Sequence, residues 1–278
     1  MQDGHKQQKN FLVLMEKSFA ELNYTMATLS LSLAFTGGGR VSPCLNKFSY
    51  EEQSLVIFDC DGVLVDSEQI SAEIISSLLS QWNIQMDAIT CQSKFHGFTM
   101  EAVVKWVNLK YGEVLDQEFL SNCREKTQKA FVSQLKPIAG IKFVLDTIKN
   151  PVCVASNGDL EKIKSSLRIV GLSKYFCGAY FSAEQVQQGK PSPDLFLYAA
   201  GKMNANHYKT IVVEDSLAGV DAAIAAKMSV LGYIPNSLPH AKIHRLAMSE
   251  AGAVIFDDME DLPMLLKEGG QTRKFDPN

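Results

Sequence analysis

The chain has 278 residues, enough for one large domain or two small ones, and 46% of them are hydrophobic, as in proteins with a sizeable buried core. Its 27 basic and 31 acidic residues leave a net charge of −4, so it lacks the positive excess with which nucleic-acid-binding proteins displace phosphate counterions. The six cysteines form no CxxC pair, so we expect neither a zinc cluster nor a disulfide framework. No apolar stretch reaches the ~18 residues of a membrane span, so we expect no membrane partner. These features favour a cytoplasmic enzyme or binding protein.

The first 50 residues differ in composition from the rest. Residues 22–50 contain no Asp or Glu, whereas Ser and Thr recur and three glycines precede Arg40. Acid-poor, Ser-rich N-termini that contain Arg are typical of organelle transit peptides. A disordered extension, or a true start at Met15 or Met26, is the alternative, so we predict an extension over residues 1–50 that is either a targeting signal or disordered.

The apolar run at residues 55–58 predicts a buried strand of a parallel sheet, and a helical segment follows it. Between residues 68 and 135, apolar residues recur at helical spacing in three stretches, 70–82, 103–111 and 119–131. No strand signal separates these stretches. We therefore predict an all-helical cap domain of residues 68–135, inserted after the first strand.

The remainder of the chain alternates between strand and helix signals. Short apolar runs predict strands at residues 152–155, 211–213, 230–233 and 254–256. Amphipathic spacing predicts helices around residues 141–148, 163–170 and 220–224. This alternation favours an α/β fold with a Rossmann-like, doubly wound parallel sheet. We assign residues 54–67 and 136–268 to this core domain and 269–278 to a C-terminal tail.

Two carboxylates, Asp59 and Asp61, directly follow the first strand and precede Gly62. Open α/β sheets bind their ligands at the carboxyl ends of the strands. Two like charges buried there are costly unless a cation or protons compensate them. Glycine lets the backbone turn and approach a ligand closely. The whole string over residues 58–67 therefore favours an active site over a solvated strand end.

Three more polar positions occur at predicted strand ends or in a loop. Ser156 could donate its hydroxyl to a phosphate oxygen, with the turn at Asn157 adding donors, although Ser156 could equally cap the next helix. Lys190 lies in a proline-containing loop, where it could neutralise phosphate or be simply solvated. Glu214 and Asp215 form a second acidic pair, and carboxylates are ligands that Mg²⁺ prefers.

Together these residues resemble the four motifs of the haloacid dehalogenase-like hydrolase superfamily, over residues 54–268. The matching motifs, in order, are Asp59-Cys60-Asp61-Gly62 with Ser67, Ser156, Lys190, and Glu214-Asp215-Ser216 with Gly219. The helical insertion lies where that family's C1-type cap belongs. One departure is Lys227, because family members usually have glycine at the end of the helix after the fourth motif; we expect modest backbone strain there.

The resemblance implies a role for each motif residue. Asp59 would be the nucleophile that forms an aspartyl-phosphate, and Asp61 the general acid and base. The Mg²⁺ cofactor would be bound by Asp59, the backbone carbonyl of Asp61 and Asp215, with Glu214 as an additional or outer ligand. The positions that match those neutralising the phosphoryl oxygens are Ser156 and Lys190.

The resemblance leaves the reaction open among a phosphatase, a β-phosphoglucomutase-like mutase and a carbon–phosphorus hydrolase; a non-catalytic phosphate-ester sensor is a fourth alternative. Mutases carry polar groups in the cap at positions where this chain has Ser71, His96 and Met100. We therefore favour a monomeric phosphatase acting on a small phosphate ester, such as a sugar phosphate or the sugar-acid phosphate 6-phosphogluconate. In the cap, His96 and Thr99 are the candidate substrate contacts.

Overall fold

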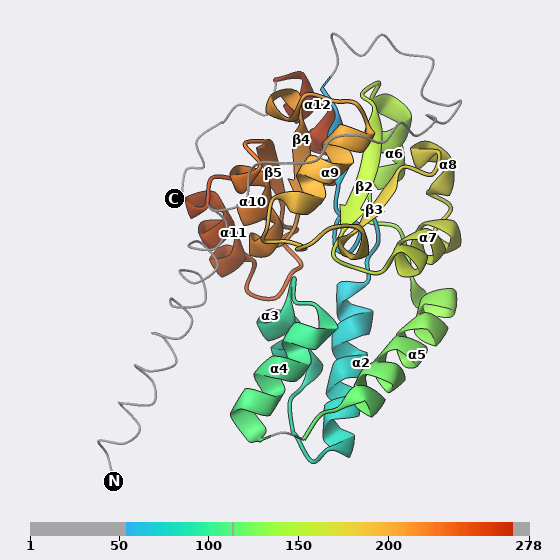
Figure 1. Cartoon of the computed structure of the whole chain (residues 1–278), viewed down its shortest axis with the longest axis vertical. Coiled ribbons are helices and arrows are strands. Elements are labelled where there is room, and N and C mark those ends of the chain that lie inside the picture. Colours follow the sequence, from blue (N-terminus) through green and yellow to red (C-terminus); the bar gives the residue numbers. More distant parts are fainter. Residues whose placement is uncertain (1–53, 113, 269–278) are drawn as a thin grey trace. The chain divides into compact units, whose positions relative to one another are not determined.

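The computed structural model describes residues 54–112 and 114–268 (Figure 1). The predicted extension at 1–50 and the tail at 269–278 lie outside these residues. The strands are β1 (Val56–Phe58), β2 (Val152–Ser156), β3 (Tyr180–Ser182), β4 (Ile211–Glu214), β5 (Ser229–Tyr233) and β6 (Val254–Phe256). Within the described ranges they form one parallel sheet in the order β3-β2-β1-β4-β5-β6.

Strand β1 lies in the interior of the sheet, between β2 and β4. Its last residue, Phe58, is opposite Val154 of β2 and Val213 of β4. Every residue of β1 is buried, as expected for a parallel strand covered on both faces. Because all neighbouring strands run in the same direction, the residues that follow β1, β2 and β4 meet at the carboxyl ends of the strands. We call this end of the strands the sheet edge.

Helices cover both faces of this sheet (Figure 1). They are α6 (Ile141–Thr147), α7 (Leu160–Ile169), α8 (Ser173–Phe176), α9 (Asp194–Lys202), α10 (Leu217–Ala225), α11 (Ala241–Glu250) and α12 (Leu262–Lys267), with short 3₁₀ turns η2 (Ala183–Gln185), η3 (His207–Lys209) and η4 (Met259–Asp261). Val56 and Phe58 belong to the main apolar cluster, where Phe58 meets Phe176 edge to face. Ile57 lies between them in β1, and its side chain takes the opposite face, as strand geometry requires.

The five predicted strands are confirmed, each to within one residue at its ends. Strand β3 was not predicted. It has three residues, of which Phe181 is buried and Tyr180 only partly buried, so it is too short to show a periodic pattern. The predicted fold class, a doubly wound parallel α/β sheet, is confirmed.

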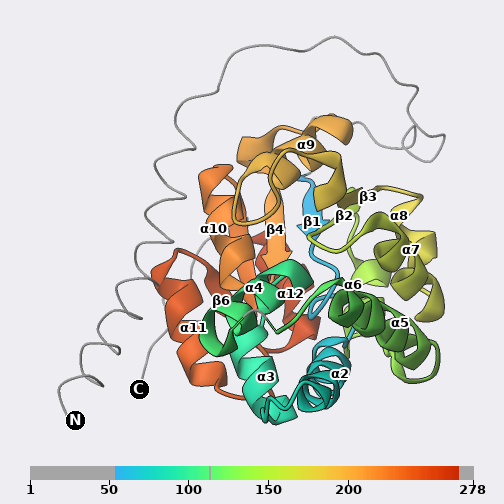
Figure 2. The same cartoon turned by 60° about the horizontal axis from the view of Figure 1, so that its bottom comes forward.

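The helical segment after β1 contains α2 (Glu68–Gln81), α3 (Ala88–Phe95), α4 (Met100–Tyr111) and α5 (Gln117–Gln134). These helices share an apolar cluster of their own, separate from the main one, in which Trp82 packs edge to face on Phe119. Figure 2 shows the four helices gathered on one side of the sheet. The three predicted helical stretches are confirmed. Helix α3 was missed because it has eight residues and buries only Cys91 and Phe95.

The end of α10 carries the departure at position 227. Lys227 has a φ of 59°, in the left-handed region, so the expectation of strain there is confirmed. The amide N–H of Lys227 donates to Ile224, and that of Met228 donates to Ala223, which is the Schellman pattern that glycine normally completes. Separately, none of the helices in the described part of the chain is long and apolar enough to cross a membrane.

Candidate active site

The loop after β1 brings its two carboxylates to the edge of the sheet. Asp59 is buried, and its backbone N–H donates to the carbonyl of Val213 at 3.0 Å, which extends the sheet by one residue. Gly62 then turns the chain with a φ of 72°. A Cβ at Gly62 would lie 1.7 Å from the Asp215 Oδ2 atom, so only glycine lets this loop pass so close to the fourth motif.

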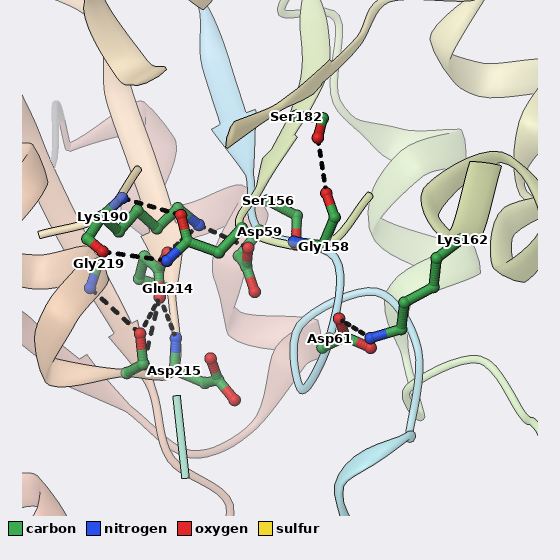
Figure 3. A network of polar contacts seen from close by, with 12 residues as sticks. Asp59, Asp61, Ser156, Gly158, Lys162, Ser182, Lys190, Glu214, Asp215 and Gly219 are labelled. Carbon is green, nitrogen blue, oxygen red and sulfur yellow. Dashed lines mark hydrogen bonds and ion pairs between the residues drawn. The ribbon is translucent and has the colours of Figure 1, made fainter. Parts of the chain in front are cut away.

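Lys190 lies between two of the acidic residues, Asp59 and Glu214 (Figure 3). Its Nζ is 2.5 Å from Asp59 Oδ1 and 2.5 Å from Glu214 Oε1. Burial alone would lower the pKa of Lys190, but these two carboxylates raise it above its usual value, so the ammonium stays charged. The lysine is thus placed to balance negative charge beside Asp59.

Asn157 holds the loop that carries Lys190. Its side-chain Oδ1 accepts from the Lys190 backbone N–H at 2.8 Å, and its Nδ2 donates to the Lys190 carbonyl at 3.0 Å. This pair of hydrogen bonds uses the amide oxygen and one amide N–H. The predicted contact of Asn157 with phosphate stays a prediction, and the side chain has one amide N–H left for it.

Glu214 is fully buried and both of its carboxylate oxygens are engaged. Oε1 binds Lys190, while Oε2 accepts from the backbone N–H of Asp215 (3.2 Å), the N–H of Ser216 (3.2 Å) and the hydroxyl of Ser216 (3.0 Å). A Cβ at Gly219 would lie 1.9 Å from the Glu214 Cδ atom, so the fourth-motif glycine leaves room for this carboxylate. Glu214 therefore orients Lys190 and the turn that follows β4.

The carboxylates of Asp59, Glu214 and Asp215 form a buried group whose ligand atoms lie within 4.8 Å of one another. Burial raises the pKa of Asp59 to about 7, although Lys190 opposes the shift, and burial likewise raises that of Asp215 well above its usual value. The neighbouring carboxylates add to both shifts, because like charges disfavour ionisation, so the group has negative charge that is not fully balanced. An oxygen-ligated divalent cation would relieve it, and the donor set fits Mg²⁺.

Asp61 has a different environment from Asp59. Its carboxylate accepts from Ser67 Oγ at 2.6 Å and pairs with Lys162 Nζ at 2.7 Å. Although burial would raise its pKa, the charge and hydrogen bond of Lys162, with the hydroxyl of Ser67, hold it below the usual value. Two carboxylates two residues apart thus differ in proton affinity, and in the metal-free protein Asp59 is the more basic of the two. A cation bound beside Asp59 would lower its pKa and leave it ionised, which is the form that a nucleophile needs.

Lys162 was not identified from the sequence. It lies in the first turn of α7, where the helix dipole disfavours a cation, and its backbone N–H is capped by Asp159. A lysine at this unfavourable position in a helix is a feature of the sequence from which a nearby anionic partner could be predicted. The same cap decides against the alternative role of Ser156, because Asp159, and not Ser156, caps α7. Ser156 is buried and its Oγ accepts from the Gly158 N–H at 3.3 Å.

His96 connects the loop between α3 and α4 to the sheet edge. Its Nδ1 lies 3.2 Å from Glu68 Oε2, and its Nε2 lies 2.9 Å from the Asp215 carbonyl oxygen and 3.5 Å from Asp215 Oδ2. Burial lowers its pKa, but Asp215 and Glu68 raise it to about 10 overall. The Thr99 hydroxyl caps α4 by accepting from Ala102. The proposed contacts of His96 and Thr99 with substrate stay predictions.

A cavity of about 810 Å³ opens onto these groups. Its wall includes Asp59, Asp61, Ser156 and Lys190 on the sheet side. Residues of α2 to α5 and their loops, Thr99 among them, form the other side, whereas His96 borders a smaller neighbouring cavity. The arrangement places a nucleophilic carboxylate, a second carboxylate, a hydroxyl and an ammonium around one space, as transfer of an anionic group requires.

Comparison with known proteins agrees with this geometry. The family model for haloacid dehalogenase-like hydrolases matches residues 56–233. A 6-phosphogluconate phosphatase of Escherichia coli is 32% identical over 77% of this chain and 95% of its own length. A phosphorylated carbohydrates phosphatase of Thermotoga maritima is 28% identical over 77% of this chain and 98% of its own. The crystal structure of a haloacid dehalogenase-like protein from Agrobacterium tumefaciens, 32% identical, superposes with a TM-score of 0.71 over 79% of this chain and 100% of that one. The chain therefore belongs to the haloacid dehalogenase-like hydrolase family.

Proposed function

We propose that this protein is a Mg²⁺-dependent phosphatase that hydrolyses small phosphorylated carbohydrates through an aspartyl-phosphate on Asp59. The observation that carries the proposal is the placement of Asp59 beside the Lys190 ammonium at the base of the cavity. The two relatives named as phosphatases of 6-phosphogluconate and of phosphorylated carbohydrates support the substrate class. Residues 54–67 and 136–268 would act as the core domain and residues 68–135 as the cap.

The chemistry proceeds in two transfers. A carboxylate oxygen of Asp59 forms a bond to phosphorus as the bond from phosphorus to the sugar oxygen breaks, and Asp61 gives its proton to that oxygen. Water then attacks the aspartyl-phosphate, Asp61 takes the proton from the water, and inorganic phosphate and the Asp59 carboxylate are released. Lys190 and Ser156 stabilise the phosphoryl oxygens in both steps.

The low proton affinity of Asp61 suits the second transfer, in which this carboxylate takes a proton from water. In the free protein Lys162 keeps this carboxylate ionised, which is the form that accepts a proton from water. The approach of an anionic phosphate raises its proton affinity, because like charges disfavour ionisation. Asp61 would therefore gain its proton when the substrate binds.

The Mg²⁺ would be held by Asp59, Asp215 and the backbone carbonyl of Asp61. Glu214 would be an outer ligand, because its two oxygens already accept hydrogen bonds from four donors. When bound, the cation supplies neutralisation of the phosphoryl charge. The mutase alternative is less well supported, because His96, which stands where mutases carry a lysine, is engaged by Glu68 and Asp215.

The test is phosphate release from a panel of sugar and sugar-acid phosphates with Mg²⁺ and with EDTA. We expect EDTA to stop release, and Asp59→Asn to lower kcat by at least about a thousandfold. Asp146→Asn, which changes an exposed acid of α6, is the matched control and should leave the rate unchanged. Equal rates in wild type and Asp59→Asn would refute the proposed nucleophile.

A further inference from the structure

The cavity continues beyond the catalytic carboxylates, between α5 and α7. Lys162, Ser165 and Arg168 of α7 line it on one side, and Arg124 and Gln128 of α5 line it on the other. The two helices contact each other, and Figure 1 shows them side by side at the junction of the sheet with the helical insertion. We call the three cations Arg124, Lys162 and Arg168 the basic arm.

The positive charge of the basic arm is only partly neutralised. Lys162 pairs with Asp61. Across residues 54–112 and 114–268, neither Arg124 nor Arg168 has an acidic group within ion-pair distance. Glu161, the acid of α7 on this cavity, pairs with Lys164 at 2.8 Å instead. Among the described residues the two arginines thus face the cavity without an ion pair, and Glu161, the acid whose charge acts on Arg168, is shared with Lys164.

Arg168 lies away from the side chains around Asp59, where the phosphoryl group of the substrate would bind. Lys162 contacts Asp61 at the catalytic end, and six residues of α7, about 9 Å of helix, lead from it to Arg168. Lys190 already provides a cation at Asp59. Arg168 therefore lies further along α7 than the cation at Asp61, and Arg124 lines the same cavity from α5. A guanidinium binds a carboxylate through two parallel hydrogen bonds.

We propose that the basic arm binds a carboxylate at the far end of the substrate, so that this protein acts on phosphorylated sugar acids in preference to neutral sugar phosphates. The inference rests on the proposed phosphatase function and adds to it a binding site for a second anionic group. A neutral sugar phosphate reaches the same nucleophile but leaves Arg124 and Arg168 without a partner.

Two substrates that differ only at the far carbon test this inference. In 6-phosphogluconate that carbon is a carboxylate, and in glucitol 6-phosphate it is a CH₂OH group. We expect kcat/KM of the wild type to be at least about tenfold higher for 6-phosphogluconate. Arg124→Gln and Arg168→Gln should each reduce that preference severalfold, and the double variant should abolish it, while kcat/KM for glucitol 6-phosphate stays within about twofold.

Lys126→Gln is the matched control, because it removes the same charge from α5 at a position that does not line the cavity. It should leave the preference intact, and thermal melting checks that every variant is folded. Hydrolysis of both substrates without preference, or a preference that survives the double variant, would overturn the basic arm while leaving the phosphatase standing. Release from no phosphate ester of the wider panel would overturn the phosphatase itself.

Discussion

Replacing Glu214 with glutamine keeps the size of the side chain and removes one negative charge from the centre of the site. In the protein, one carboxylate oxygen binds the Lys190 ammonium and the other accepts three hydrogen bonds from Asp215 and Ser216. Glutamine has a single acceptor oxygen. If that oxygen serves the three donors, its NH₂ group must face the ammonium of Lys190, and two donors then oppose each other.

The magnitude follows from burial. Glu214 is 0% exposed and Lys190 is 9% exposed, so water cannot replace the lost partner. Removing one member of a buried ion pair typically costs about 3–5 kcal/mol, and within residues 54–112 and 114–268 Lys190 keeps Asp59 as its one carboxylate partner. At about 2–4 °C per kcal/mol, we expect the Tm of Glu214→Gln to fall by about 6–20 °C.

Denaturant unfolding and thermal melting in EDTA measure this loss without any contribution from metal binding. Asp215→Asn is the informative comparison, since burial raises the pKa of Asp215 well above its usual value and its charged form is unfavourable. That variant should lose less stability in EDTA than Glu214→Gln, although it removes a proposed metal ligand and leaves His96 with Glu68 as its ion-pair partner among the described residues. A loss under about 1 kcal/mol for Glu214→Gln would refute the reasoning, because the four hydrogen bonds would then contribute little.

Three further predictions concern the backbone and the charges of the site. Gly62→Ala should abolish activity and lower Tm, because its Cβ would overlap Asp215 at a φ of 72°; unchanged melting would contradict that close approach. The pKa of Asp59 is about 7 in the folded protein against 3.8 ordinarily, so the folded state binds more protons and the metal-free protein loses stability as pH rises from about 4 through 7. Mg²⁺ should therefore raise Tm more at pH 8 than at pH 5, and equal shifts would count against this linkage. Lys227→Gly should stabilise the protein by about 0.5–1 kcal/mol in denaturant unfolding, because it relieves a left-handed φ of 59°; a loss of stability would show that the Lys227 side chain contributes more than the strain costs.

Much of the fold and the position of the site were predictable because they depend on local signals. Short buried strands show as apolar runs, and parallel strands bring their carboxyl ends to one edge, so Asp59, Ser156 and Asp215 were expected to meet there. The structure brings all three to that edge. Strand β3 and helix α3 were missed because three and eight residues with few buried side chains produce no periodic pattern.

The sequence by itself thus determined the α/β fold class, the helical insertion and which carboxylates gather at the sheet edge. Only the tertiary structure decided how those groups are paired. Lys162 meets Asp61 across 101 positions of the chain, and His96 meets Asp215 across 119. The proton affinities of these carboxylates then follow from burial and from such distant partners. The pairing of these groups and their proton affinities both depend on the packing of the helices against the sheet, because long-range contacts and exclusion of water exist only in the folded chain.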